Sequence, residues 1–561
     1  MPTLDWIGKK AVVNHHREVP YRLLKCDREK SFGDPESGNL LVQGDNLEAL
    51  KALLPYYAGK VKCIYIDPPF NTGAEDWIYN DNVSSPEMRD WLGKHVQSEG
   101  QDLSRHDKWL CMLYPRLRLL RDFLTADGTI FFHIDDNEVA NALLLCDSIF
   151  GISNRMSLIS FKQASATGHK SINPGCVSVM NYIIVYAANK PSWRPNRLFT
   201  GRARDKRYNG WIENLSDHHT RWRFTTLIAG YAETQKISVR EARKRVREDS
   251  AELDNFVLNN AASVIQMVTP DYESVGQQTR DAIDQSLGSP DEIFCVLRDG
   301  YSSVYLKGGQ RIIFYSDKVK MIDGVAVAGE PLTTLWDDLL SNNIHKEGGV
   351  EFRKGKKPET LLKRCIELST EPGDLVMDTF AGSGTTAAAA HKMQRRYLTV
   401  EMHDHAQTHI VPRLSKVIEG EQGGISKDVN WNGGGGFRYC TLGAPLFDPE
   451  GDINEAVSFR DLAAHVFFCE TGSPIPKQAS PANPLIGAFQ GRAIYLLYNR
   501  DSAGVASQRA GNVLNLASLS RLPQTEAGER VVYAEGCTIP PARLRAEGVV
   551  FKHIPYQIGG L

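Results

Sequence analysis

The chain has 561 residues and a formal net charge of −2, from 65 Lys and Arg against 67 Asp and Glu. This length exceeds one ordinary domain, so we expect three or four structural units. The near-neutral charge excludes a uniformly basic nucleic-acid-binding protein, so any such surface must be local. No run of residues reaches membrane-spanning length, and residues 1–10 lack the apolar core of a signal peptide.

The ten cysteines are scattered and form no Cys-x-x-Cys pair. This spacing argues against a zinc site and against a disulfide framework. We therefore expect no bound metal, and reduced thiols of the kind found in cytoplasmic proteins.

The first clear pattern of elements lies between residues 40 and 66. Residues 40–42 predict a strand, and apolar residues at helical spacing predict a helix over 47–54, which Asp45 or Asn46 can cap. Residues 61–66 are β-branched and aromatic and predict a buried strand. This strand–helix–strand order favours a βαβ unit with a parallel sheet.

The buried strand ends in Asp67-Pro68-Pro69-Phe70. The two prolines fix φ and remove two backbone donors, which makes the turn stiff. The Asp67 carboxylate and the Pro68 carbonyl are then neighbouring acceptors, and Phe70 adds an aromatic face. These groups suit a flat ligand with an exocyclic amine, such as adenine. An ordinary strand followed by a proline turn explains this stretch equally well.

A polar, aromatic stretch follows, up to about residue 104, and includes Trp77, Tyr79 and Trp91. A loop of this length is usually functional. The pattern then predicts a helix over 109–124, a strand over 129–135, a helix over 143–150 and a strand over 182–187.

Residues from about 190 to 335 have a different character. Between residues 190 and 247, Lys and Arg outnumber Asp and Glu about three to one, and tryptophans are interleaved with them. Basic and aromatic residues together suit phosphate neutralisation and base contact. The candidate DNA-binding residues are Arg194, Arg197, Arg202, Arg204, Arg221 and Arg223. A solvated helix face explains the charges of residues 239–247 equally well.

A second informative stretch covers residues 354–401. Residues 375–377 predict a strand, a glycine-containing turn follows, and a helix and another strand lead to Glu401. Glycines let the backbone approach a ligand closely. Glu401 lies 23 positions beyond Asp378 (401 − 378), near the offset of about 20 for an acid that binds ribose. The array fits an adenosine-containing cofactor. A dehydrogenase site fits less well, because Gly-x-Gly-x-x-Gly is not completed at Ala387.

The glycines at 433–436 predict a flexible hinge with a domain border just after it. Residues from about 445 onward predict a small α/β unit, with strands near 493–498, 530–534 and 549–554. No catalytic constellation is visible in this part of the sequence.

The pair of motifs, Asp-Pro-Pro-Phe at 67–70 and Asp-x-Phe-x-Gly-x-Gly-Thr at 378–385, resembles amino-methylating DNA methyltransferases of the β order. Residues 44–50, 65–73, 336–358 and 433–439 also resemble the modification subunits of type III restriction–modification systems. The resemblance implies a doubly wound, Rossmann-like mixed α/β sheet, the S-adenosylmethionine-dependent methyltransferase fold. It implies a catalytic half at 1–190, a target-recognition region at 191–335, a cofactor-binding half at 336–440 and a C-terminal α/β domain at 441–561.

The resemblance also implies roles for individual residues. Asp67, Pro68, Pro69 and Phe70 would be catalytic. The S-adenosylmethionine site would comprise Asp45, Asn46, Lys357, Pro358, Asp378, Phe380, Gly382, Gly384, Thr385 and Glu401. The chain departs from the family twice: Phe70 stands where Tyr is frequent, and only Lys357-Pro358 remains of a longer lead-in to the cofactor site.

The implied reaction is methyl transfer to N6 of an adenine flipped out of double-stranded DNA. Methylation of cytosine N4 stays open, although Asp rather than Ser at position 67 favours adenine. A non-catalytic recognition subunit for a nuclease is a further alternative. The resemblance also implies a homodimer that can join a restriction helicase–nuclease subunit.

Overall fold

The computed structural model describes residues 4–34, 36–71, 103–165, 175–298, 300–322, 324–339, 344–352, 355–502 and 511–554. Trp77, Tyr79 and Trp91 of the polar aromatic stretch lie outside these residues. The chain forms two compact units, one of residues 1–196 and 334–561 and one of residues 197–333. No described helix has the length and apolar character needed to cross a membrane.

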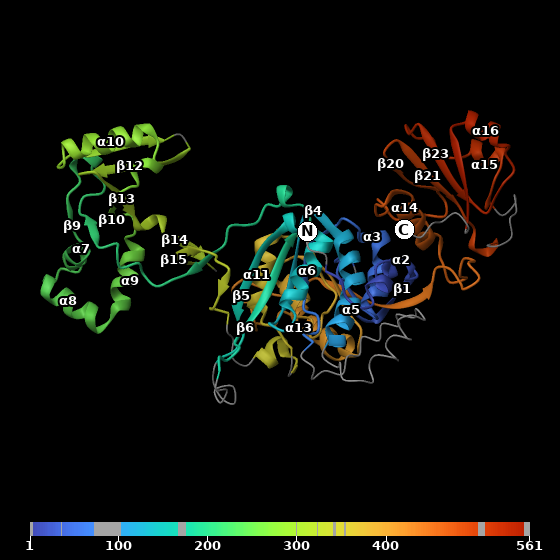
Figure 1. The fold of residues 1–561 in the computed structure, drawn as a ribbon, viewed down its shortest axis with the longest axis horizontal. Coiled ribbons are helices and arrows are strands. Elements are labelled where there is room, and N and C mark those ends of the chain that lie inside the picture. Colours follow the sequence, from blue (N-terminus) through green and yellow to red (C-terminus); the bar gives the residue numbers. More distant parts are fainter. Residues whose placement is uncertain are drawn as a thin grey trace. The chain divides into compact units, whose positions relative to one another are not determined.

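The larger unit is built on one mixed sheet, which has ten strands among the described residues (Figure 1). The strand order is β1-β19-β2-β18-β17-β3-β4-β6-β5-β16. In chain order the strands are β1 (Arg22–Gly33), β2 (Leu40–Gln43), β3 (Val61–Ile66), β4 (Leu124–Ile134), β5 (Arg155–Lys162), β6 (Met180–Ala187), β16 (Leu335–Trp336), β17 (Leu375–Asp378), β18 (Arg396–Glu401) and β19 (Gly436–Pro445).

The middle of this sheet is parallel from β19 through β2, β18, β17 and β3 to β4. Strand β6 is antiparallel to both of its neighbours, β4 and β5. Strands β17 and β18, from the second half of the chain, lie between β2 and β3 from the first half. The doubly wound mixed sheet predicted from the sequence is confirmed.

Helices cover both faces of the sheet. They are α1 (Lys9–Val12), α2 (His15–Glu18), α3 (Asn46–Tyr57), α5 (Leu103–Phe123), α6 (Val139–Phe150), α11 (Glu359–Ser369), α12 (Thr385–Lys392) and α13 (Val411–Ile418). Ile64 and Ile66 of β3 share a hydrophobic core with α3, α5 and α6. Because strand side chains alternate, the intervening residues Cys63 and Tyr65 face the opposite layer, where α11 contacts β3.

One expectation about the cysteines is wrong. Cys26 and Cys440 form a disulfide, although they are 414 residues apart in the sequence. They are register partners on the antiparallel strands β1 and β19, which brings their side chains together. The sequence shows no sign of this pairing, because it depends on the return of β19 to a place between β1 and β2.

The smaller unit contains a six-stranded antiparallel sheet in the order β11-β12-β13-β10-β8-β9 and a three-stranded sheet in the order β14-β15-β7. Its strands are β7 (Phe199–Gly201), β8 (Gly210–Ile212), β9 (Phe224–Thr226), β10 (Val264–Val268), β11 (Ile293–Arg298), β12 (Tyr301–Lys307), β13 (Gln310–Phe314), β14 (Val319–Ile322) and β15 (Val325–Pro331). Its helices are α7 (Leu227–Thr234), α8 (Val239–Glu248), α9 (Ser250–Asn259) and α10 (Gln277–Gly288). Its core packs Trp211 and Tyr231 against Phe256.

The C-terminal residues form sheets in the orders β20-β21-β23-β25 and β22-β24. The elements are α14 (Phe459–Thr471), β20 (Leu485–Phe489), β21 (Arg492–Leu497), β22 (Val513–Leu514), α15 (Leu516–Ser520), β23 (Glu529–Ala534), β24 (Gly536–Cys537), α16 (Pro541–Ala546) and β25 (Val549–His553). Phe459 and Leu462 of α14 belong to the same hydrophobic core as Leu53 and Leu54 of α3. This part of the chain is therefore packed onto the central sheet's helix layer.

The shared core predicts that Leu462 stabilises the larger unit. Leu462→Ala should lower the free energy of unfolding by about 2–5 kcal/mol, because it removes a fully buried side chain and leaves a cavity. Leu516→Ala is the matched control, since Leu516 is 60% exposed. Urea unfolding of the full chain measures both variants, and equal stabilities of the two would contradict the shared core.

Candidate active site

The two motifs meet at one edge of the central sheet. Strands β3 and β17 are parallel neighbours, with Cys63 opposite Val376 and Ile64 opposite Met377. The turns that follow these strands therefore emerge side by side. A narrow cavity is lined by residues of both turns and of the segment before α11: Tyr65, Asp67, Phe352, Gly355, Lys357, Leu362, Asp378, Phe380, Ala381, Gly382, Ser383, Thr385 and Thr386.

The turn after β3 is held by residues from two helices. The indole N–H of Trp109 on α5 donates to the Pro69 carbonyl at 2.7 Å. Asn71 has φ of 59°, and its side-chain amide donates to Glu138, which is fully buried before α6. Glu138 Oε1 also lies 2.6 Å from His106 Nδ1. These contacts fix the backbone on both sides of Phe70. No pattern in the sequence singles out Trp109 or Glu138.

His133 lies behind the Asp67 carboxylate and was not predicted as a site residue. Its Nε2 is 3.0 Å from the amide nitrogen of Asn181, which can only donate, so Nε2 accepts and Nδ1 carries the proton. The Nδ1–H faces the Tyr65 hydroxyl at 2.7 Å and Asp67 Oδ1 at 3.6 Å. Burial, assisted by the nearby charge of Lys357, lowers the pKa of His133 well below its usual value. A neutral imidazole therefore bonds the Tyr65 hydroxyl and lies behind the carboxylate. His133 lies near the end of β4, the strand that pairs with β3. This position was the feature of the sequence from which its place beside Asp67 could have been predicted.

A second cavity, of about 550 Å³, lies on the Phe70 side of the turn. Its lining residues are Phe70, Asp135, Asp136, Gln163, Ala164, Val177, Ser178, Val179, Met180 and Asn181. The volume falls in the range of small-ligand pockets. Phe70 supplies an aromatic wall, and the Asn181 amide that bonds His133 supplies a polar one. The turn at 67–70 thus borders both cavities.

The turn after β17 has the geometry of a backbone cradle. The Asp378 carboxylate accepts from the Phe380 N–H at 2.9 Å and from the Thr386 hydroxyl at 2.5 Å. Gly384 has φ of 76°, and a Cβ there would lie 2.9 Å from a methyl carbon of Ile410. Gly382 also has positive φ, at 53°. Both positions therefore favour glycine because of their positive φ. At Gly384 a side chain would also be too close to Ile410.

Glu401 braces this cradle. One carboxylate oxygen accepts the Gly382 N–H at 2.7 Å and the other accepts the His403 N–H at 3.3 Å. Burial raises the pKa of Glu401 above its usual value. Contact with a ribose, which the sequence predicts, stays a prediction.

Asp45 and Asn46 tie α3 to the same region. Asp45 caps α3 through the Leu47 N–H at 2.8 Å, and its other oxygen accepts from Arg116 Nη2 at 3.0 Å. The Asn46 amide donates to the Thr379 carbonyl at 2.9 Å and its oxygen accepts from Arg116 Nε. Arg116 on α5 is fully buried, and the sequence did not mark it.

Lys357 lies at the Asp67 end of the first cavity. Its Nζ is 2.7 Å from Asp67 Oδ2 and 4.9 Å from the centre of the Phe70 ring. Pro358 follows directly as the residue before α11. The sequence assigned Lys357 to the cofactor, and the structure adds a direct contact with the predicted catalytic carboxylate.

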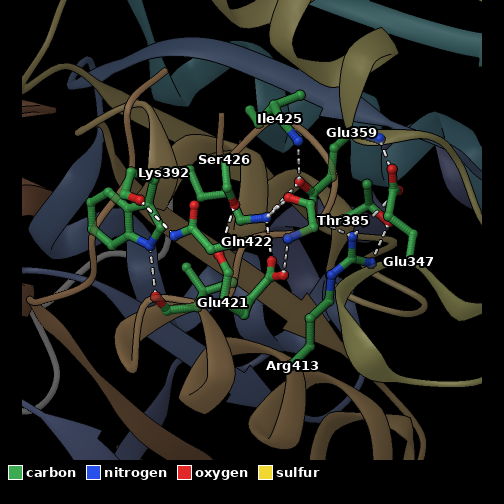
Figure 2. Close-up of polar contacts among 12 residues, drawn as sticks. Glu347, Glu359, Thr385, Lys392, Arg413, Glu421, Gln422, Ile425 and Ser426 are labelled. Carbon is green, nitrogen blue, oxygen red and sulfur yellow. Dashed lines mark hydrogen bonds and ion pairs between the residues drawn. The ribbon is translucent and has the colours of Figure 1, made fainter. Parts of the chain in front are cut away.

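A buried charged network joins the start of α11 to the glycine turn (Figure 2). Glu359 bonds Arg413 Nη2 and Lys392 Nζ, each at 2.8 Å, and all three side chains are fully buried. Arg413 also donates to the Thr385 hydroxyl at 2.7 Å. The residue after Pro358 and the last part of the glycine turn are thereby held by the same guanidinium.

The six predicted DNA-binding arginines are not equivalent. Arg194 belongs to the larger unit and the other five to the smaller one. Arg204 is largely buried and pairs with Asp254 at 2.6 Å, so it stabilises the smaller unit. Arg223 is mostly exposed and lies 3.1 Å from Glu213. Arg221 is exposed beside Trp222. A role in DNA binding stays a prediction for all six.

Comparison with known proteins decides the family. Residues 61–411, more than half of the chain, match the family N6_N4_Mtase, described as DNA methylase. The chain belongs to this DNA methylase family. The matched residues include both turns and the whole of the smaller unit between them.

Two relatives illustrate the similarity within the DNA methylase family. The chain is 33% identical over 438 residues to the HindVI Mod subunit of Haemophilus influenzae, named as a probable type III restriction-modification enzyme, covering 74% of this chain and 55% of that protein. It is 28% identical over 446 residues to the type III restriction-modification enzyme EcoP15I Mod subunit of Escherichia coli, covering 72% and 64%. The chain therefore spans somewhat more than half the length of these relatives.

A solved structure of a Thermus thermophilus protein, described as a putative DNA modification methylase complexed with S-adenosyl-L-methionine, also aligns with this chain. The identity is 12%, the alignment covers 72% of this chain and 97% of that chain, and the TM-score is 0.31. The TM-score is low, so the doubly wound fold of this chain is assigned from its own strand order.

The buried network predicts a large effect of removing one charge. Lys392→Met should lower the free energy of unfolding by about 3–5 kcal/mol, because it leaves the buried Glu359 without one of its two cations. Lys244→Met is the control, since Lys244 pairs with Glu248 in solvent. Chemical unfolding of both variants is the measurement, and a small loss for Lys392→Met would show that the network contributes little.

Asp378 predicts a specific pH dependence of stability. Burial raises the pKa of its carboxyl from 3.8 to about 7, so the unfolded chain ionises first and the free energy of unfolding falls as pH rises across this interval. Asp378→Asn does not ionise there. Urea unfolding at about pH 5 and pH 7 measures the change in the free energy of unfolding. We expect the Asp378 contribution, a loss of stability on going to pH 7, to be absent from the variant and present in the wild type. An identical change in both proteins would contradict this assignment.

Proposed function

We propose that the chain transfers a methyl group from S-adenosyl-L-methionine to N6 of an adenine turned out of double-stranded DNA. The observation that carries this proposal is that Asp67 lines one cavity with the glycine turn while Phe70, three residues later, lines a second. A methyl donor and an acceptor base held in these two cavities would meet at the turn. Membership of the DNA methylase family supports the same conclusion.

The residues of the first cavity fit an adenosine-containing cofactor. Gly382 lines the cavity without a side chain, Gly384 leaves room for Ile410 behind the turn, and Asp378 with Glu401 keeps the turn's backbone in place. S-adenosyl-L-methionine, when bound, supplies an electrophilic methyl group on sulfur. The remaining chemistry falls to Asp67, Pro68 and Phe70.

The exocyclic amine of adenine is a weak nucleophile because its lone pair is delocalised into the ring. Hydrogen bonds from this amine to the Asp67 carboxylate and the Pro68 carbonyl favour a pyramidal nitrogen whose lone pair can attack the methyl carbon. As the N–C bond forms, the bond from methyl to sulfur would break, the sulfur would leave as a neutral thioether, and the amine would give up one proton to water. Alignment of the reacting groups supplies about 7–11 kcal/mol in well-oriented reactions. Acceptors that are already in place add to this, and the Trp109 bond to the Pro69 carbonyl holds the turn that carries them here.

The target base must leave the duplex to reach Asp67. The cavity of about 550 Å³ beside Phe70 has room for it. Stacking on an aromatic ring contributes about 1–3 kcal/mol per base. Phe70 performs this stacking without a hydroxyl, so polar recognition of the base falls to other lining residues of this cavity, among them Asn181 and Gln163.

The smaller unit, residues 197–333, is the proposed target-recognition region. It lies in the sequence between the two halves of the site and carries the exposed Arg221 and Arg223 next to Trp222. Cationic and aromatic side chains suit phosphate and base contacts. The described residues beyond 441 belong to the larger unit, where α14 packs against α3, and they have no assigned role in catalysis.

The two relatives are named as Mod subunits of type III restriction–modification enzymes, which supports a similar setting for this chain. We propose that the chain acts on cytoplasmic DNA, as a homodimer that can join a restriction helicase–nuclease subunit. Size-exclusion chromatography with light scattering tests the dimer, and co-purification with a helicase–nuclease encoded nearby tests the partner.

Asp67→Ala tests the catalytic assignment. We expect methyl transfer to fall by at least ~100-fold, because one of the two preorganised acceptors is removed. Binding of S-adenosyl-L-methionine, measured by calorimetry, should stay within a few-fold of the wild type. Asp127→Ala is the control, at an acid on β4 that pairs with Lys62. Retained transfer by Asp67→Ala would remove the catalytic assignment.

Methylation of cytosine N4 is the second candidate, because that amine needs the same acceptors. Digestion of methylated DNA to nucleosides and mass spectrometry separate the two. We expect N6-methyladenine, and N4-methylcytosine alone would overturn the adenine assignment. Absence of both, with DNA binding retained, would favour a recognition subunit for a nuclease.

A further inference from the structure

Lys357 makes the same two contacts that the proposed reaction requires of the target base. Its ammonium donates to Asp67 Oδ2 at 2.7 Å and lies 4.9 Å from the centre of the Phe70 ring. The side chain is only 6% exposed. An amine that donates to the carboxylate and rests on the ring is what an adenine would present there. The ammonium and the adenine amine therefore compete for one place.

The main chain around Lys357 is anchored on both sides. Before it, the Lys356 ammonium donates to the Val350 carbonyl at 2.8 Å and to the Glu347 carbonyl. After it, Glu359 is held by Arg413 and Lys392 in the buried network of Figure 2.

The backbone N–H of Glu359 also donates to the Glu347 carboxylate at 3.1 Å. Movement of the segment would break several buried pairs at once. Movement of the Lys357 side chain alone breaks only its ion pair with Asp67 and its contact with the Phe70 ring.

The Lys357 side chain can make that movement. A lysine stem has four rotatable bonds and a compact ammonium with three donors. The Gly355 carbonyl, 3.1 Å from the ammonium, remains as an acceptor when Asp67 is taken by another amine. The exchange at Asp67 is thus a swap of donors, in which the carboxylate never loses a partner.

We propose that Lys357 is a competing internal ligand of the base site. Its ammonium holds Asp67 and covers Phe70, the target amine displaces it, and its return displaces the methylated base. The return favours product release because a methylated amine keeps one N–H and cannot bond both Asp67 and the Pro68 carbonyl. This inference rests on the proposed methyl transfer. It adds a residue that controls the binding and release of the target base.

The test compares neutral and charged replacements in the full chain. Lys357→Met and Lys357→Gln remove the charge, Lys357→Arg keeps it, and Lys427→Met is a control at an exposed lysine. The probe is DNA made by polymerase chain reaction, which is unmethylated, with radiolabelled S-adenosyl-L-methionine. KM for DNA, kcat, and the rate of a single turnover are measured for each protein.

We expect both neutral variants to lower KM for DNA about three- to tenfold, the size expected for loss of a competing cation–π contact. We expect kcat to fall more than the single-turnover rate does, because product leaves slowly, and a burst should appear in the first turnover. Lys357→Arg and Lys427→Met should resemble the wild type.

Three results separate the outcomes. Transfer by the wild type with an unchanged or raised KM in both neutral variants would overturn the role of Lys357 and leave the proposed function intact. A fall in the single-turnover rate equal to the fall in kcat would also overturn it, since Lys357 would then act in the chemical step. No transfer by the wild type, to adenine or cytosine, would overturn both proposals.

Discussion

The parallel pairing of β3 with β17 is the constraint on which the site depends. It brings the ends of two strands, more than 300 residues apart in the chain, to the same edge of the sheet. Ligands of doubly wound sheets bind at this edge, where the chain direction of the crossovers changes. Without this pairing, Asp67 and the glycine turn would be two unrelated loops. With it, they line one cavity.

Each turn at this edge is held by groups that do not take part in the proposed chemistry. Trp109 and Glu138 fix the proline turn, while Arg116 and Glu401 fix the elements around the glycine turn. The Glu359–Arg413–Lys392 network connects the glycine turn to the segment that carries Lys357. Removing one partner from a buried ion pair of this kind is costly, so the network keeps the two elements in one arrangement. As a result of these contacts, the proposed acceptors, the Asp67 carboxylate and the Pro68 carbonyl, are in place before a base binds.

Electrostatics divide the cavity into two parts. Near the glycine turn, burial and neighbouring carboxylates raise the pKa of Asp378, so this acid carries less than its full charge near neutral pH. Near the proline turn, the Lys357 ammonium accompanies the Asp67 carboxylate, and the neutral His133 lies behind it. The carboxylate nearest the proposed reaction is therefore the one that keeps a cation as its companion.

The sequence by itself determined the secondary structure around both motifs, the two motifs and the fold class. Alternating and β-branched patterns, proline stiffness and glycine turns are local, and they predicted β3, β17, β18 and the turns that follow them. The sequence also separated the basic, aromatic region that became the smaller unit.

Only the tertiary structure decided which distant residues meet. The interleaving of β17 and β18 between β2 and β3, the Cys26–Cys440 disulfide and the contact of Lys357 with Asp67 join residues 290 or more positions apart. His133, Trp109 and Arg413 gained their roles in the same way, because each is an ordinary core position in its own element. Local patterns report how a segment folds, whereas side-chain partners follow from how the segments pack.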